Sequence, residues 1–181
     1  NTVYYNEQGR DAVAFLKSPP FNWNISGGEV LLNCDLEKSY FITDWKVSAS
    51  KKIKFPAKTK SNGKYTLKYV QLDANGDTTG TPITINNAVS GHVITGLTQG
   101  AEYRIYAFGS NFNQISFGDY SDSRNDILRI KQWGAINWVS FNNAFYNCPN
   151  LDVVATDAPD LSAVTNIGYM FYKCPNLKFN N

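Results

Sequence analysis

The middle of the chain alternates apolar and polar residues with a period of two. In the segment 64–72, Tyr65, Leu67 and Tyr69 alternate with polar side chains, which is typical of a half-buried β-strand. Asn75-Gly76 follows as a hairpin turn signal, and the segment 81–89 predicts the return strand. Further strands are predicted at Trp45–Val47, Lys51–Phe55 and Tyr103–Phe108. Short strands separated by turns predict an antiparallel β-sandwich over residues 39–120.

The first 38 residues form a separate N-terminal lead. Apolar residues at 12–16 precede Pro19-Pro20, which would end a helix, so the pattern predicts a short helix from about Glu7 to Lys17. The lead then continues into GEVLLNCDL, which predicts a strand.

The last third of the chain contains a repeated phrase. AFYNCPNL runs from Ala144 to Leu151, and MFYKCPNL runs from Met170 to Leu177, 26 residues later. A unit of this kind cannot bury its apolar face alone, whereas a neighbour built to the same plan can cover it. We therefore predict stacked units at about 125–150 and 151–176, with the start of a third. Parallel strands are expected at 127–130 and 151–155, with a helical turn in each unit.

The apolar residues that recur in the phrase are predicted to form the core of the repeats. They are Phe145, Cys148, Leu151, Phe171, Cys174 and Leu177.

The order of these residues, with AVTNIGYMF before the second copy, resembles the BspA-like leucine-rich repeats of bacterial surface proteins, abundant in Bacteroidetes. The resemblance covers about Asp126–Phe179. The preceding segment, from FITDWKV to FGD, resembles the PKD-like β-sandwich that comes before such repeats. The family's DWGDG hairpin is replaced here by residues 69–73, so the broader term is an immunoglobulin-like sandwich. The resemblance implies a mainly β protein: a sandwich over 39–120, then a short leucine-rich-repeat solenoid of α+β units over 121–181.

The same resemblance implies a function. It indicates a non-enzymatic binding or adhesion module, located at the cell surface or secreted, and lipid-anchored through an N-terminal signal that has been removed. Its repeat surface would recognise a host or bacterial surface protein, or a glycan. The alternative is a carbohydrate-binding accessory module of a polysaccharide-use system.

Composition narrows the partners. The net charge is only +2, which gives no field suited to nucleic acid, and no apolar run approaches the length of a membrane span. Cys34, Cys148 and Cys174 are an odd number without metal-binding spacing, so a disulfide framework is not expected. Cys148 and Cys174 are predicted to be buried thiols.

Catalytic, metal and cofactor sites find little support. His92 is the single histidine, and the motifs of hydrolases, nucleotide-binding loops and zinc peptidases are absent. DANGD spaces its oxygen side chains like a calcium loop, but it fits a hairpin turn better. Asp119, Asp122 and Asp126 could hold a weak cation or simply solvate a connector. No catalytic residue, metal or cofactor is therefore assigned.

Aromatic residues are the remaining candidates for binding. Tyr146, Tyr169 and Tyr172 lie near the repeated phrase, where they could either contact a partner or fill the core. Trp133 and Trp138 are expected to fill the core where the sandwich meets the repeats. A weak homodimer through the edge at 177–181 is also expected, because an uncovered last unit exposes an apolar side.

Overall fold

The computed structural model describes residues 3–5, 28–30, 38–60 and 63–178. The chain divides into two compact units, Asn1–Lys38 and Ser39–Asn181, so the end of the N-terminal lead coincides with the boundary between them. In the first unit, β1 (Val3–Tyr5) and β2 (Gly28–Val30) pair in parallel. The helix predicted at 7–17 lies outside the described residues.

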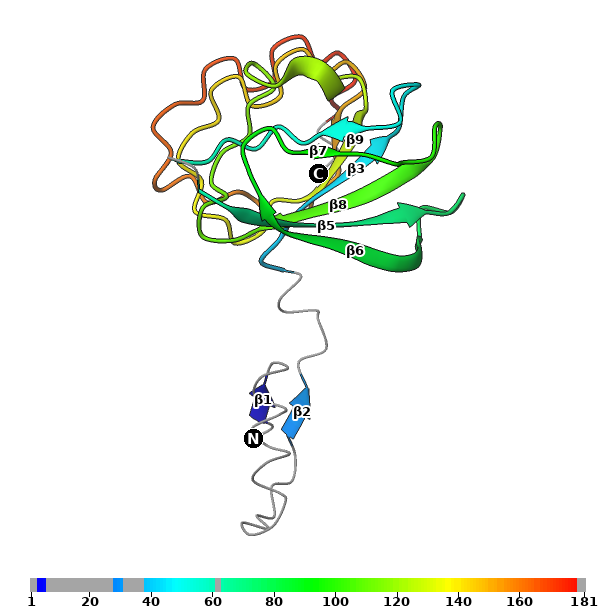
Figure 1. The fold of residues 1–181 in the computed structure, drawn as a ribbon. Helices are drawn as coiled ribbons and strands as arrows, with labels where there is room; N and C mark the ends of the chain where they lie inside the picture. The colour runs from blue at the N-terminus through cyan, green and yellow to red at the C-terminus, as the bar shows by residue number, and fades with distance from the viewer. Residues whose placement is uncertain (1–2, 6–27, 31–37, 61–62, 179–181) are drawn as a thin grey trace, which may run out of the picture. The chain divides into compact units, whose positions relative to one another are not determined.

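The second unit is built on a mixed six-stranded sheet in the order β10-β9-β3-β8-β5-β6 (Figure 1). Its strands are β3 (Phe41–Lys46), β5 (Tyr65–Leu72), β6 (Thr78–Ala88), β8 (Glu102–Phe108), β9 (Ile127–Gln132) and β10 (Asp152–Val153). A separate antiparallel pair consists of β4 (Ile53–Lys54) and β7 (Val93–Ile94), and η1 (Ser121–Ser123) is a 3-10 helix. The described part of the chain is thus mainly β and contains no α-helix.

The sheet continues across residue 120, where the sequence suggested a domain boundary. β9 lies beyond that position, yet it pairs antiparallel with β3 and brings β10 into the same sheet. Backbone hydrogen bonds of a sheet satisfy polar groups that would otherwise be buried without partners, so this pairing ties the two segments together. Residues 39–181 therefore form one compact unit.

The central hairpin follows the sequence prediction. β5 and β6 pair antiparallel, and the turn between them contains Gly76 with a φ of 83°. The Asp73 carboxylate accepts hydrogen bonds from the backbone N–H groups of Asn75 (2.8 Å) and Asp77 (3.0 Å), which is how Asp stabilises such turns. β6 is the edge strand and contains Pro82, which removes one donor from the exposed edge.

The two short strands of the repeat region are parallel neighbours, as the period suggested. Their register pairs Val153 with Ile130, an offset of 23 residues instead of 26. The offset of 26 is recovered at the repeated phrase, because the first unit has three fewer residues between its strand and its phrase than the second.

The copies of the phrase stack directly on one another. Backbone N–H groups of Phe141, Asn143, Phe145 and Asn147 donate to the carbonyl oxygens of residues 166, 168, 170 and 172, at 2.7–2.9 Å. On the other side of the first copy lies a third segment, 113–118, in which Gln114 forms a parallel bridge with Ser140, again at an offset of 26. We call these three layers, 113–118, 139–147 and 165–172, the stacked turns; they run side by side in Figure 1.

The helical turns expected in the repeat units are not α-helical. Asn143 and Asn147 have φ values of 53° and 56°, and Tyr169 and Lys173 repeat them at 54° and 57°. A left-handed residue every fourth position breaks a right-handed helix before it can propagate. The α+β character expected of the repeats is therefore replaced by tight turns.

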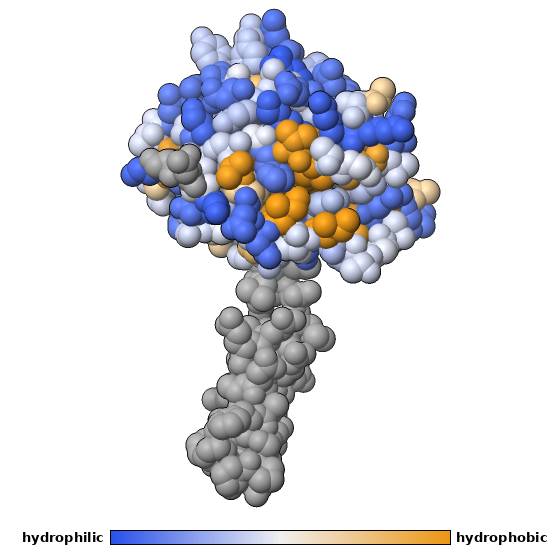
Figure 2. Space-filling view, in the orientation of Figure 1, coloured by the Kyte–Doolittle hydropathy of each residue, from blue (hydrophilic) through white to orange (hydrophobic). Residues whose placement is uncertain are grey.

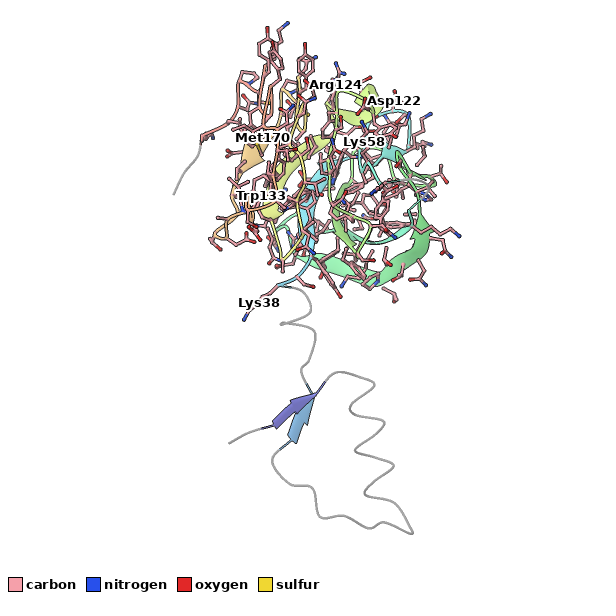
Figure 3. The ribbon with its side chains drawn as sticks, turned by 90° about the vertical axis from the view of Figure 1, so that its left-hand side faces the viewer. Lys38, Lys58, Asp122, Arg124, Trp133 and Met170 are labelled. Carbon is pink, nitrogen blue, oxygen red and sulfur yellow. The ribbon has the colours of Figure 1, made fainter. Side chains whose placement is uncertain are left out.

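One apolar core joins the sheet to the stacked turns. Trp133 and Trp138, which are 5% and 0% exposed, lie within it, as the sequence suggested for this junction. The Trp138 ring meets Phe41 of β3 edge to face at 5.2 Å, and Trp133 meets Phe145 of the stacked turns at 6.1 Å. Figure 3 shows Trp133 between the sheet and the outer turns. These aromatic contacts fix the turns against the sheet.

Candidate functional site

The three tyrosines proposed for binding gather in one place. The rings of Tyr146 and Tyr172 are stacked, with centroids 5.3 Å apart and planes 20° apart. Tyr169 meets Tyr172 edge to face at 5.6 Å. Tyr169 and Tyr172 are 65% and 45% exposed, so they line the surface and do not fill the core. Together they form one wall of a groove of about 700 Å³.

The remaining lining of this groove is polar. It consists of Gly118, Arg124, Asn142 and Asn143. We call this site the tyrosine groove. It has no carboxylate and no aliphatic side chain in its lining.

The repeat creates the tyrosine groove. Tyr146 and Tyr172 occupy the same position in consecutive turns, so the backbone stacking places one ring over the other. Asn143 and Tyr169 are likewise equivalent, and their left-handed conformation turns both side chains toward the groove. Asn tolerates that conformation well, whereas for Tyr it costs free energy that the surrounding structure must supply.

Two cations border the tyrosine groove. Arg124 makes no ion pair with any described residue, and its Nε is buried without a hydrogen-bond acceptor. Lys173 Nζ lies 5.5 Å from the centroid of the Tyr172 ring, within the range of a cation–π contact. Figure 3 places Arg124 beside Asp122, but Asp122 pairs with Lys54 at 3.0 Å. The groove therefore carries positive charge that the described protein groups do not neutralise.

A second groove, of about 530 Å³, lies over one face of the sheet and was not anticipated from the sequence. At its base, Asp44 of β3 is almost fully buried and accepts hydrogen bonds from Arg104 Nε (2.8 Å) and Arg129 Nε (3.1 Å). Arg129 also pairs with Glu102. Hydrogen bonding to Asp44 raises the pKa of Arg104. Because these charges satisfy one another, the cluster acts as a structural cross-link of three strands.

The predicted repeat-core residues differ in burial. Phe145, Cys148 and Leu151 of the first copy are fully buried, and Cys174 is 9% exposed. Phe171 and Leu177 of the second copy are only partly buried against the same core. The difference arises because the first copy has a stacked turn on each side, whereas the second has a described neighbour on one side only.

Cys148 and Cys174 are free thiols. Burial raises the pKa of both, so neither is a thiolate at neutral pH. The Cys174 thiol lies 2.9 Å from the Phe145 carbonyl oxygen, while Cys148 has only a distant contact of 3.9 Å to the Tyr146 carbonyl oxygen. Cys34 lies outside the described residues.

The carboxylates considered for a cation site go to separate partners. Asp119 pairs with Lys58 and accepts from Ser116 Oγ (2.8 Å), which lowers its pKa, and Asp122 pairs with Lys54. Asp126 is buried elsewhere, and burial raises its pKa. Among the described residues, no three His, Cys, Asp or Glu side chains lie close enough to hold a metal ion.

Within the described ranges, no helix has the length and hydropathy needed to cross a membrane. No family model, curated protein or solved structure matches this chain.

Proposed function

We propose that this chain is a non-enzymatic binding module that recognises its partner through the tyrosine groove. The observation that carries the proposal is the gathering of Tyr146, Tyr169 and Tyr172 beside Arg124 in one exposed groove. Tyr and Arg are the side chains most often found at the centre of recognition sites, because they offer large rigid surfaces with a polar tip.

The finer architecture belongs to the same proposal. We place the module among BspA-like leucine-rich-repeat proteins of the bacterial surface, with an immunoglobulin-like or PKD-like sandwich joined to the first repeats. Support comes from the 26-residue stacking of the turns and from the repeated Phe–Cys–Leu positions within it. In such a protein each added turn would extend the binding surface, as in other repeat arrays. A surface or secreted location follows from this resemblance.

A carbohydrate-binding accessory module is the second candidate, and one observation favours it. The tyrosine groove combines aromatic rings with the amides of Asn142 and Asn143, which can exchange hydrogen bonds with hydroxyl groups. The rings are not coplanar, however. Tyr146 and Tyr172 stack face to face and Tyr169 stands at 88° to Tyr172, so a ligand meets ring edges and phenol groups instead of one flat platform.

A glycan array and a pull-down from surface extracts would test the proposal together. We expect the parent chain to give a specific signal in at least one of them. Two variants should weaken that signal: Tyr172→Ala, and Tyr169→Asn, which introduces the residue found at the equivalent position 143. Ile83→Ala is the matched control, because Ile83 is a similarly exposed apolar residue, 54% accessible, on β6. Binding that both tyrosine variants retain in full would refute the tyrosine groove as the recognition site.

A further inference from the structure

We propose that the ligand of the tyrosine groove is an acidic glycan, in which the carboxylate of a uronic or sialic acid residue pairs with Arg124. This inference rests on the proposed function and names the ligand class of the same site.

Arg124 provides the first argument. Its guanidinium lines the groove, yet it makes no ion pair with any described residue, and its Nε is buried without an acceptor. A partly buried cation without a counter-charge costs free energy, and proteins normally offset that cost with a nearby carboxylate. Other arginines of the same unit follow that rule, since Arg104 and Arg129 both bind Asp44. Arg124 is the exception, and it lies where a ligand can reach it.

The neighbouring loop strengthens this argument. Asp119 and Asp122 come shortly before Arg124 in the chain, but each is held by a lysine, Lys58 and Lys54 respectively. Lys173 adds a second cation at the rim, over the Tyr172 ring. The groove therefore favours an anion, and the planar fork of arginine matches a carboxylate in particular.

The lining decides between an acidic glycan and an acidic peptide. A peptide-binding groove typically supplies apolar pockets for anchoring side chains. This groove supplies none, because its lining is three tyrosines, two asparagines, one arginine and one glycine. Tyrosine faces and edges suit the C–H groups of a sugar ring, and the Asn142 and Asn143 amides suit its hydroxyls. The volume of about 700 Å³ lies within the range of small-ligand sites.

The test measures binding of the whole chain to matched ligand pairs by calorimetry. Oligogalacturonate is compared with its methyl ester, and sialyllactose with lactose, so that each pair differs mainly in a carboxylate. Poly-glutamate serves as the acidic peptide. We expect one acidic glycan to bind at least about tenfold more tightly than its uncharged partner, and the Arg124→Gln variant to lose that preference. Added salt should weaken the binding.

Three controls keep the result interpretable. Lys52→Gln removes an exposed cation away from the groove and should leave the preference unchanged. Thermal melting shows whether Arg124→Gln folds, and Tyr169→Asn, at a residue that is 65% exposed, tests the same groove without touching Arg124. Arg124→Lys keeps the charge but loses the planar fork, so it should retain only part of the preference.

The outcomes separate this inference from the proposed function. Equal binding of the charged and uncharged glycans, or an Arg124→Gln variant with the parent's preference, would overturn the acidic-glycan inference while leaving a binding groove. Preferential binding of poly-glutamate would replace the glycan with a peptide and overturn the inference in the same way. Loss of glycan binding in Arg124→Gln but not in Tyr169→Asn and Tyr172→Ala would place the site elsewhere and overturn both.

Discussion

Individual residues in the repeated phrase have roles that their spacing alone could largely predict. Cys148 and Cys174 recur at the same position, and a small apolar group that recurs in stacked units is expected to lie inside. The tyrosines of the same phrase could not be assigned from sequence, because a ring one position away from a core residue can point inward or outward. Their exposure depends on left-handed turns at positions 143 and 169, and only the folded chain reveals those.

Replacing Cys148 with Ser should destabilise the protein. Cys148 is fully buried and has only a 3.9 Å sulfur contact, so a hydroxyl at this position would be buried without a good partner. We expect a loss of about 1–3 kcal/mol in the free energy of unfolding, measured by urea denaturation. Cys174→Ser is the matched control. Its hydroxyl would inherit the Phe145 carbonyl, 2.9 Å from the present thiol, and should cost less.

Thiol labelling checks the same prediction independently. In a Cys34→Ser background, Cys148 and Cys174 should react slowly in the native protein and rapidly after unfolding, because burial raises the pKa of both thiols. Fast labelling of the native protein, or equal stability of the parent and Cys148→Ser, would contradict it.

Elements determined by local sequence were the most predictable. The β5–β6 hairpin follows from alternating residues on either side of Asn75-Gly76. Two features that depend on tertiary contacts were not predictable. The 23-residue register of β9 and β10 reflects a shorter loop in the first unit, and segment 113–118 stacks as a further turn although it lacks the repeated phrase. The buried Asp44 was missed for a similar reason, because its two arginine partners come from strands 60 and 85 residues away.

The end of β9 gives a test at the scale of an element. Gly134 follows this strand with a φ of 67°, and a Cβ added there would lie 2.3 Å from the Tyr40 carbonyl oxygen. Asp157 also accepts its N–H at 2.8 Å, so the backbone has little freedom to move away. Gly134→Ala should therefore destabilise the protein well beyond the left-handed conformational cost of about 1–2 kcal/mol.

Gly96→Ala separates the two effects. Gly96 has a similar φ of 75°, but nothing lies within 4 Å of the Cβ position, so only the conformational cost applies. Urea unfolding of the two variants should show a clearly larger loss for Gly134→Ala. Equal losses would mean that the close approach to Tyr40 does not constrain this element.

At the scale of the whole unit, the sheet and the stacked turns share one core, so the binding groove rests on a rigid support. The sequence suggested two adjoining domains because its pattern changes from strand alternation to repeats near residue 120. The aromatic contacts that join Phe41 to Trp138 and Trp133 to Phe145 cross that position and cannot be inferred from periodicity. Apolar residues also remain visible between hydrophilic ones on the surface of the unit (Figure 2).

The last stacked turn predicts a weak self-association of this unit. The turn at 139–147 is covered on both sides, whereas no further described turn lies against 165–172. Ile167 is accordingly 62% exposed, Leu161 is 53% exposed, and Leu177 is only partly buried. An uncovered turn of a repeat array presents apolar side chains and unpaired backbone groups that a second copy of the chain can cover. We expect the average mass from light scattering to rise with protein concentration. Ile167→Lys and Leu177→Lys should suppress that rise, whereas Ile83→Lys, at an exposed position on edge strand β6, should not. A parent that stays monomeric across the series, with the same profile as its variants, would show that the last turn needs no partner in solution.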